Sequence, residues 1–513
     1  MMSEKKQTAV NLIAKIISYG TTLLISFFLT PYLVDKLGKE AYSFYPIANN
    51  FVNYMGVITI ALNSMASRFI TIHLTQGNKK RANTYFVSIL YSNVIMSLVL
   101  LIPMIIIIVF LPHILNIPPE LLASVKLLFA LVFISMLVNL FTNVLGVAVF
   151  SQNRMDLSSV TDIIVGTSRV VLYVLLFWLF EPNIAYVGVV SLAVALIQVV
   201  IQRYYTKKLL PFMSFSRKYF RVGAVKEVVS SGIWNSVNQI GVVLLSTIGL
   251  MMCNKLYGAA DAADYSIALT IPNFINGIVS MLSSVFLPGL TIKYARGNKK
   301  EIIDHVHMAQ NVIGMIDNIP TAVFMAVGVN FFRLWTPSVD PYRLQVLSIL
   351  AIGYLLVTSV AWPISNLNTV MNKVKVPAIV MVITGLVNIL LIYLTYRFTN
   401  LGVYAVPLGQ MILFILNRVL FVGIYSAHCL KEKWYIFYPA IIKNFISAAI
   451  IFGISYFVNS IFDPMTWFGL VAECAVLGII ALCINAVIVF KPSGIKKIVG
   501  QIALFMNRKM RGR

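Results

Sequence analysis

The chain has 513 residues, of which 59% are hydrophobic and 11% are charged, and its formal net charge is +23. Soluble domains carry roughly a quarter charged residues, so this composition excludes a soluble globule and favours a membrane protein. The positive charge does not indicate nucleic-acid binding, because cytoplasmic loops of membrane proteins collect lysine and arginine. The four cysteines show no CxxC pair and no Cys/His cluster, so we expect no metal site, no disulfide framework and no cofactor.

Apolar stretches long enough to cross a hydrocarbon layer of about 30 Å recur to the end of the chain. They predict an all-α, polytopic membrane protein with about 14 transmembrane helices. We place these segments near residues 11–34, 44–72, 84–111, 122–150, 158–180, 184–206, 228–256, 262–292, 302–335, 342–371, 375–398, 401–428, 434–461 and 465–490. No loop exceeds roughly thirty residues, which leaves no room for a soluble domain.

The distribution of basic residues predicts the orientation. With the N-terminus in the cytoplasm, the inward loops hold about 28 lysines and arginines and the outward loops about 6, so we expect both termini to be cytoplasmic. The longest loop joins the sixth and seventh segments. It is basic and aromatic, and we expect it to lie along the inner leaflet.

An internal repeat divides the chain. The tetrapeptide Gly-Asn-Lys-Lys occurs at 77–80 and again at 297–300, an offset of 220 residues, and Gly38 meets Gly258 at the same offset. Several matches in one register predict two six-helix halves, and an even number of helices makes the two repeats parallel. The expected domains are an N-terminal six-helix lobe (1–210), a cytoplasmic basic linker (211–227), a C-terminal six-helix lobe (228–430), two additional transmembrane helices (431–490) and a basic cytoplasmic tail (491–513).

Polar residues spaced three or four apart share one face of a helix. Four segments, two in each half, carry such stripes, and we expect them to face a water-filled cavity between the halves. Interhelical hydrogen bonding is the alternative use of the same residue types. The stripe residues that we expect to contact a ligand are Asn53, Asn63, Asn235, Asn238, Asn273 and Asn276.

Charges inside the membrane are the next candidates, because each costs about 2.5–3.5 kcal/mol to insert. Arg169, Asp317 and Arg418 lie near mid-segment, and Asp162 lies seven residues before Arg169 on the same face. Ligand contact and structural pairing both remain open for the two arginines. Lysine, arginine, asparagine and serine suit an anionic, hydroxyl-rich ligand, since guanidinium matches phosphate geometry. Asp317 is the first candidate for ion coupling, and Asp162 is the second.

The first segment, "NLIAKIISYGTTLLISFFLTPYLVDKLGKEAYSFY", and "LTQGNKKRANTYF" after it are similar to the multidrug/oligosaccharidyl-lipid/polysaccharide flippase superfamily. Together with the 6 + 6 + 2 layout they resemble in particular the polysaccharide transporters (Wzx-type O-antigen flippases) and the lipid II flippases. The resemblance implies alternating access and a cationic lumen for a pyrophosphate-sugar head. The family's lumen cations would correspond to Lys15 and Arg68, whereas the matching second-half positions hold the uncharged Asn235 and Pro288.

Three functions therefore compete. The first is a flippase that moves a polyprenyl-pyrophosphate-linked oligosaccharide across the bacterial plasma (inner) membrane for cell-surface polysaccharide biosynthesis. Its expected partners are that substrate, membrane lipids, and a polymerase or glycosyltransferases of the same pathway. The second is an ion-coupled multidrug or metabolite exporter. The third, a membrane glycosyltransferase or polymerase, normally needs an acid/base pair and a large outer loop, so we expect no enzyme.

Overall fold

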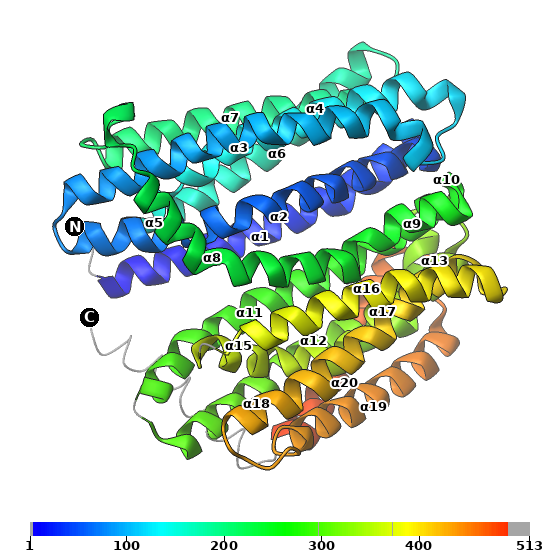
Figure 1. Cartoon of the computed structure of the whole chain (residues 1–513). Coiled ribbons are helices and arrows are strands. Elements are labelled where there is room, and N and C mark those ends of the chain that lie inside the picture. The colour runs from blue at the N-terminus through cyan, green and yellow to red at the C-terminus, as the bar shows by residue number, and fades with distance from the viewer. Residues whose placement is uncertain (1–3, 296, 372, 491–513) are drawn as a thin grey trace. The chain divides into compact units, whose positions relative to one another are not determined.

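The computed structural model describes residues 4–295, 297–371 and 373–490, and the regular elements in these ranges are helices (Figure 1). Thirteen helical stretches of the described residues are long and apolar enough to cross a membrane. The predicted segment near 262–292 corresponds to α10 (Ala259–Ala268) and α11 (Thr270–Ala295). The expected all-α polytopic fold is therefore confirmed, and helices satisfy the backbone where lipid offers no hydrogen-bond partner.

The chain forms two compact units. Unit 1 comprises residues 1–266 and 381–389, and unit 2 comprises residues 267–380 and 390–513. Besides most of α10, unit 1 contains α1 (Glu4–Leu37), α2 (Lys39–Thr75), α3 (Lys79–Ile114), α4 (Leu122–Leu145), α5 (Val147–Ser151), α6 (Met155–Leu179), α7 (Ala185–Leu209), α8 (Val222–Val242) and α9 (Ile248–Tyr257). Besides α11, unit 2 contains α12 (Lys299–Trp335), α13 (Pro341–Ile352), α14 (Leu355–Thr358), α15 (Trp362–Val370), α17 (Ala405–Ile415), α18 (Gly423–Cys429), α19 (Tyr438–Phe462) and α20 (Trp467–Asn485). The helix α16 (Lys375–Phe398) contributes residues 381–389 to unit 1 and its ends to unit 2.

Several predicted spans are interrupted helices. The span near 401–428 contains α17, a π-helical segment η6 (Leu416–Val422) and α18, and the span near 228–256 contains α8, a π-helical segment η3 (Val243–Thr247) and α9. Pro363 lies in the first turn of α15, which follows a short 3₁₀ turn. π-helical turns are rare and occur frequently at functional sites, so η6 is a candidate functional segment.

The sequence repeat reappears as repeated local structure. Gly38 and Gly258 each separate two helices and have φ angles of +79° and +102°. Gly77 and Gly297 have φ angles of +74° and +73°. The following asparagine caps the next helix in both copies: Asn78 Oδ1 accepts the Arg81 amide, and Asn298 accepts the amides of Lys300 and Glu301. Positive φ favours glycine, which explains why the same letters recur.

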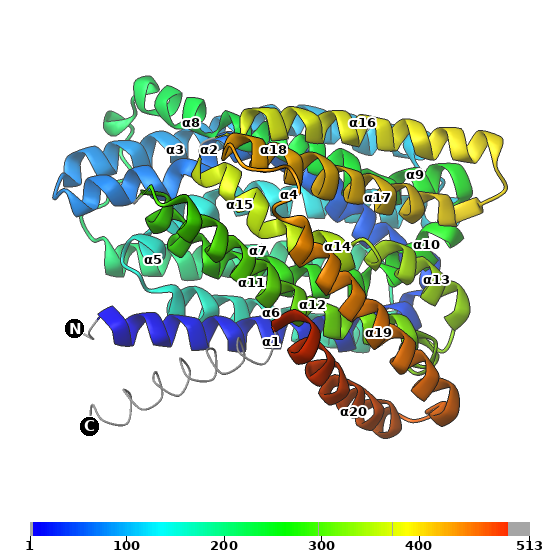
Figure 2. The same ribbon diagram turned by 90° about the horizontal axis from the view of Figure 1, so that it is seen from below.

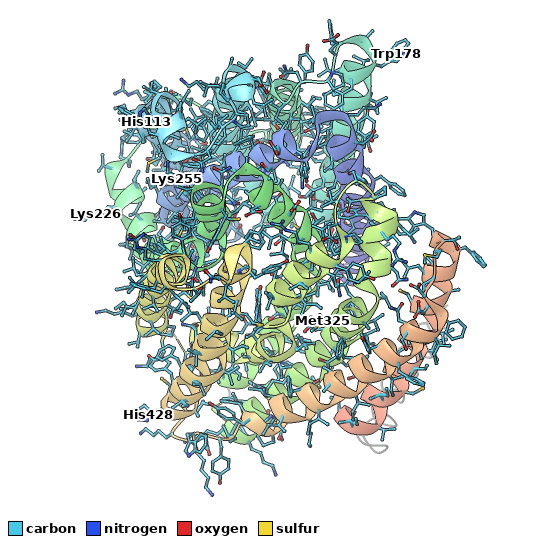
Figure 3. All side chains as sticks on the ribbon, turned by 90° about the vertical axis from the view of Figure 1, so that its right-hand side faces the viewer. His113, Trp178, Lys226, Lys255, Met325 and His428 are labelled. Atoms are coloured by element: carbon cyan, nitrogen blue, oxygen red, sulfur yellow. The ribbon has the colours of Figure 1, made fainter. Side chains whose placement is uncertain are left out.

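Apolar side chains lie both inside the units and on their surfaces. A core cluster of unit 1 includes the buried Leu62, Ile70, Phe86 and Val144. In unit 2, α12 packs against α19 and α20, which lie side by side in Figure 2. Trp178 is 83% exposed and points away from the ribbon (Figure 3). Such large exposed apolar side chains are typical of a lipid-facing surface.

The loops of unit 1 alternate between two ends. At one end, the Lys79 ammonium lies over the Phe212 ring at 5.3 Å, and Asn11 Nδ2 donates to the Asn153 carbonyl at 2.9 Å. At the other end, Lys255 Nζ donates to the His113 carbonyl at 2.6 Å (Figure 3). The first end carries the basic residues of 79–81 at the start of α3, of 203–208 at the end of α7 and of 217–221 between α7 and α8, and we call it the cation-rich end of unit 1.

Candidate functional site

The polar stripe of α1 faces α6 within unit 1. Lys15 Nζ forms an ion pair with Asp162 Oδ2 at 3.4 Å, and Ser18 Oγ lies 3.4 Å from the same oxygen. The two charged side chains are 49% and 38% exposed, so the pair is accessible to solvent or ligand. In the described part of the chain, Asp162 thus forms its ion pair with a different helix and not with Arg169, the partner that helical spacing suggested.

Arg169 of α6 lines a polar cavity of about 110 Å³ inside unit 1. The other polar side chains that line the cavity are Tyr45, Asn49, Ser135, Asn139, Ser191 and Gln198, from α2, α4 and α7. Arg169 Nε and Asn139 Oδ1 are buried, and neither has a hydrogen-bond partner in the structure. None of the described residues that line the cavity is a carboxylate. A cation among amides and hydroxyls suits an anion or several water molecules.

The remaining site predictions on α2 have different environments. Asn53 is exposed. Asn63 is half-buried and exchanges hydrogen bonds with Asn93 of α3 at 3.2 and 3.0 Å. The backbone of Arg68 belongs to α2, but its side chain lies outside the described residues. The contact with Asn93 is the interhelical use of asparagine that was left open as the alternative.

Two predicted asparagines of α8 are exposed. Asn235 Nδ2 donates to Ser64 Oγ of α2 at 3.3 Å, and Asn238 lies one turn further along. The adjoining α2–α8 seam is close, because Ser236 Oγ donates to the Val57 carbonyl at 3.1 Å. The two exposed side chains therefore flank a packed seam, and the amide of Asn235 bridges α8 and α2.

In unit 2, Arg418 is held by a hydroxyl and an aromatic ring. It lies in the π-helical segment η6, where its Nη1 donates to Ser365 Oγ at 2.8 Å and its guanidinium lies 5.7 Å from the centre of the Trp362 ring. Tyr354 is close enough to Arg418 to interact electrostatically, and its hydroxyl accepts a hydrogen bond from Asn276 Nδ2 at 2.9 Å. The structure thus brings together Arg418 and Asn276, which were predicted separately.

The other two predictions in unit 2 make no hydrogen bond with this cluster among the described residues, although Asp317 is close enough to Tyr354 to interact electrostatically. Asn273 is exposed on α11. Asp317 of α12 is 1% exposed, and its Oδ1 accepts from Thr321 Oγ1 at 3.1 Å. Its Oδ2 accepts no hydrogen bond of good geometry from the described residues, and the Ser359 hydroxyl is a further neighbour of the carboxylate. Among the described residues, no group of three or more His, Cys, Asp or Glu gathers as metal ligands would.

Sequence reasoning missed the neutral partners of both arginines. Trp362, Ser365 and Tyr354 surround Arg418, and Asn139 and Gln198 line the Arg169 cavity. The only signal for them was an isolated polar or aromatic residue within an apolar segment, and such residues are too common to single out. Their grouping depends on which helices pack together.

Comparisons with known proteins agree with this fold. A family model described as "Polysaccharide biosynthesis protein" matches residues 7–291. The "Uncharacterized membrane protein EpsK" of Bacillus subtilis (strain 168) is 29% identical over 464 residues, which cover 90% of this chain and 92% of that protein.

Two solved structures share the fold, each with a TM-score of 0.66. The first is an inward-facing multidrug resistance MATE family transporter, 14% identical, for which the alignment covers 82% of this chain and 98% of the transporter. The second is the lipid II flippase MurJ in an inward closed conformation, 15% identical, with 94% and 99% covered. As expected, these relatives of known activity are transporters and a flippase rather than enzymes.

Proposed function

Because the chain belongs to the polysaccharide biosynthesis protein family and is a multi-pass membrane transporter by fold, we propose that it flips a polyprenyl-pyrophosphate-linked oligosaccharide. The membrane would be the bacterial plasma membrane, the termini would be cytoplasmic, and the product would serve cell-surface polysaccharide synthesis such as O-antigen assembly. Residues 1–210 and 228–430 would act as the two lobes of an alternating-access transporter. A polymerase or glycosyltransferases of the same pathway would supply or consume the substrate.

The observation that carries this proposal is the set of side chains that surround Arg418. A guanidinium offers paired donors that match a phosphate, and here it lies beside Trp362, Tyr354 and Asn276. Aromatic faces and amides are suited to sugar rings and hydroxyls. Within the described residues, Arg418 makes no ion pair with a carboxylate. Its positive charge therefore remains available for an anionic head group.

Lys15, Arg169 and the exposed asparagines would complete the path. Lys15 forms an ion pair with Asp162, so it would bind an anionic group more weakly than Arg418. Arg169 lies in its own cavity, where it would take one phosphate or carboxylate group. Asn53, Asn235, Asn238 and Asn273 are exposed and would hydrogen bond with sugar hydroxyls. Asn63 and Arg68 remain weaker candidates.

The test is complementation of a flippase-deficient strain that makes a lipid-linked glycan. We expect Arg418→Ala to reduce surface glycan about tenfold or more and to accumulate the lipid-linked intermediate on the cytoplasmic face, since charge-assisted hydrogen bonds contribute about 1.5–3 kcal/mol. Arg418→Lys should recover part of the activity. Arg397→Ala is the matched control, because Arg397 is an exposed arginine of unit 2 at the end of α16. Equal activity of Arg418→Ala and Arg397→Ala at equal protein levels would overturn the proposal.

A second candidate is an ion-coupled exporter on the same fold. Asp317 favours it, because a fully buried carboxylate with one oxygen that accepts no hydrogen bond of good geometry suits a proton or cation that binds and leaves. Asp162 is the weaker coupling candidate, since Lys15 already neutralises it. Asp317→Asn should abolish dependence on the ion gradient. Drug or metabolite resistance that requires Asp317 but not Arg418 would favour the exporter over the flippase.

A further inference from the structure

The segment between α7 and α8 is fixed to the cation-rich end of unit 1. The Ser214 amide donates to Asn83 Oδ1 of α3 at 2.9 Å, and the Arg221 amide donates to Ser88 Oγ at 2.9 Å. The Phe215 ring packs edge-on against Phe86, with ring centres 5.6 Å apart. This segment is therefore a docked strap across the ends of the helices, and we call residues 210–221 the strap.

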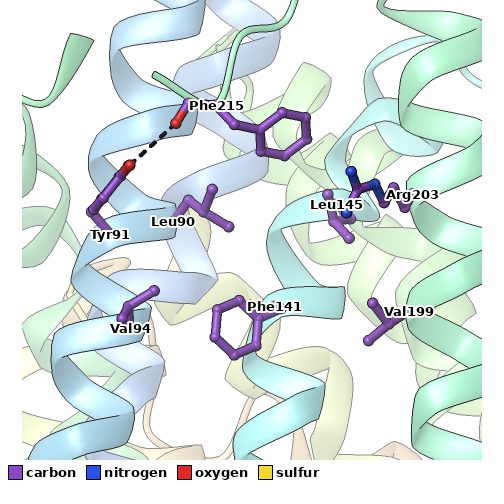
Figure 4. Close-up of a pocket in the computed structure, with 8 residues that line it drawn as sticks. All are labelled: Leu90, Tyr91, Val94, Phe141, Leu145, Val199, Arg203 and Phe215. Carbon is purple, nitrogen blue, oxygen red and sulfur yellow. Dashed lines mark hydrogen bonds between the residues drawn. The ribbon is translucent and has the colours of Figure 1, made fainter. Parts of the chain in front are cut away.

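Under the strap lies an apolar pocket of about 340 Å³ (Figure 4). Its walls come from Leu90 and Val94 of α3, Phe141 of α4 and Val199 of α7. Phe215 of the strap lines the same pocket, and Tyr91 Oη holds it there by donating to the Phe215 carbonyl at 3.3 Å. The volume falls in the range of pockets that bind small molecules.

One cation lies among these apolar side chains. The Arg203 guanidinium lines the pocket beside Phe215, with its carbon 6.0 Å from the centre of that ring (Figure 4). In the part of the chain that the structure describes, neither Arg203 nor the other basic residues around the strap form an ion pair with a carboxylate. These other basic residues are Lys79, Lys207, Lys208, Arg217, Lys218 and Arg221.

A second pocket, of about 360 Å³, shares Phe215 with the first. Lys207, Thr206 and Pro211 line it, so it is closer to the basic residues and more polar than the first pocket. Along α7, Leu196 and Val200 are 51% and 69% exposed and apolar, as expected for a helix face in contact with lipid chains. The apolar pocket lies beside a lipid-facing surface and has cations without carboxylate partners at one end. This arrangement is complementary to an amphiphile with a negatively charged head group.

We propose that this pair of pockets binds one anionic phospholipid. Part of an acyl chain would fill the apolar pocket, and the phosphate would sit between Arg203 and Lys207, where charge-assisted hydrogen bonds are strongest. Basic residues at a membrane surface attract anionic lipids, and here the apolar pocket adds a chain-binding component that attraction alone lacks. The bound lipid would hold the strap against α3, α4 and α7.

The test uses the purified full-length protein in a neutral detergent. Native mass spectrometry would measure binding of phosphatidylglycerol, with phosphatidylcholine of the same chains as the neutral comparison. We expect phosphatidylglycerol to bind at least tenfold more tightly, and Arg203→Gln to remove this preference. Lys226→Gln is the matched control, because Lys226 is an exposed cation at the start of α8 that lines neither pocket. Val199→Trp, which fills the apolar pocket, should weaken the binding of both lipids.

Each of three outcomes would overturn the proposal. Equal binding of the two lipids would show that the pocket takes any acyl chain. Equal losses in Arg203→Gln and Lys226→Gln would show diffuse attraction without a site. Complete displacement of the lipid by inorganic phosphate would indicate a free-phosphate site. Should Val199→Trp fail to fold, the comparison of Arg203→Gln with Lys226→Gln still decides, since both change surface cations.

Discussion

Gly232→Ala should separate two helices that cross at contact distance. A methyl group at Gly232 of α8 would lie 2.1 Å from the Ala61 carbonyl oxygen and 2.9 Å from its carbon. One turn along each helix, Ser236 Oγ donates to the Val57 carbonyl at 3.1 Å. Small residues four apart let helix backbones approach in this way in membranes. The obstacle is backbone, so no side-chain rotation can make room.

The cost follows from this geometry. Ordinary contact with a methyl group begins near 3.4 Å, so α2 and α8 would have to move apart by roughly 1.3 Å at this point. Overpacking of this kind costs about 1–3 kcal/mol, and the better helix propensity of alanine returns at most about 1 kcal/mol. We therefore expect Gly232→Ala to lower the melting temperature of the detergent-solubilised protein by several degrees, measured by size-exclusion chromatography after heating.

Gly223→Ala is the control in the same helix. No atom lies within 4 Å of the position that its methyl group would take, so this change should be neutral or slightly stabilising. Both substitutions add the same methyl group. The two positions differ in whether the backbone of another helix lies within contact distance of that group. A melting temperature of Gly232→Ala equal to or above that of Gly223→Ala would refute the close packing of α2 against α8.

Four further substitutions test three other features by thermal melting of the same preparation. Gly38→Ala and Gly258→Ala should each cost about 1–3 kcal/mol, because both glycines have backbone angles that other residues avoid; a loss at only one of them would contradict the duplicated turn. Asn93→Ala should cost about 1–3 kcal/mol, because the buried Leu140 carbonyl loses its donor at 3.0 Å; an unchanged melting temperature would indicate that water replaces the amide. Lys15→Gln should change stability by less than about 1 kcal/mol, since its ion pair is exposed; a larger loss would show that the pair is shielded.

The helices and the repeated turns could be predicted from the sequence because each depends on local chemistry. Long apolar stretches give spanning helices wherever they occur. Gly38 and Gly258 adopt positive φ in both halves, and Asn78 and Asn298 cap the following helices in both halves. These features depend only on residues that are close in the sequence. Identical residues at one offset were therefore sufficient to identify the repeat. The π-helical interruptions, such as η6, were not predicted, because no repeated residue or turn signal marks them in the sequence.

The partners of the polar residues could not be predicted in the same way. A stripe shows which face of a helix is polar, but interhelical hydrogen bonds and a hydrated surface use the same side chains. Asn63 faces Asn93, and Asn276 faces Tyr354, whereas Asn53 and Asn273 are exposed. Each partner lies on a helix that the spacing along one segment does not specify. Only the three-dimensional packing of the helices shows which asparagines form interhelical hydrogen bonds and which are exposed.

The two halves repeat their turns but not the positions of their charges. At the offset of 220, Arg169 corresponds to Ile389 and Arg418 corresponds to Gln198. Gln198 lines the Arg169 cavity. The two mid-segment arginines therefore do not occupy equivalent positions of the repeat. An arginine in a membrane helix costs about 2.5–3.5 kcal/mol, and no carboxylate pairs with either one among the described residues. No internal ion pair offsets that cost, and the groups around the two arginines are hydroxyls, amides and an aromatic ring; this is why we propose Arg169 and Arg418 as ligand-binding residues.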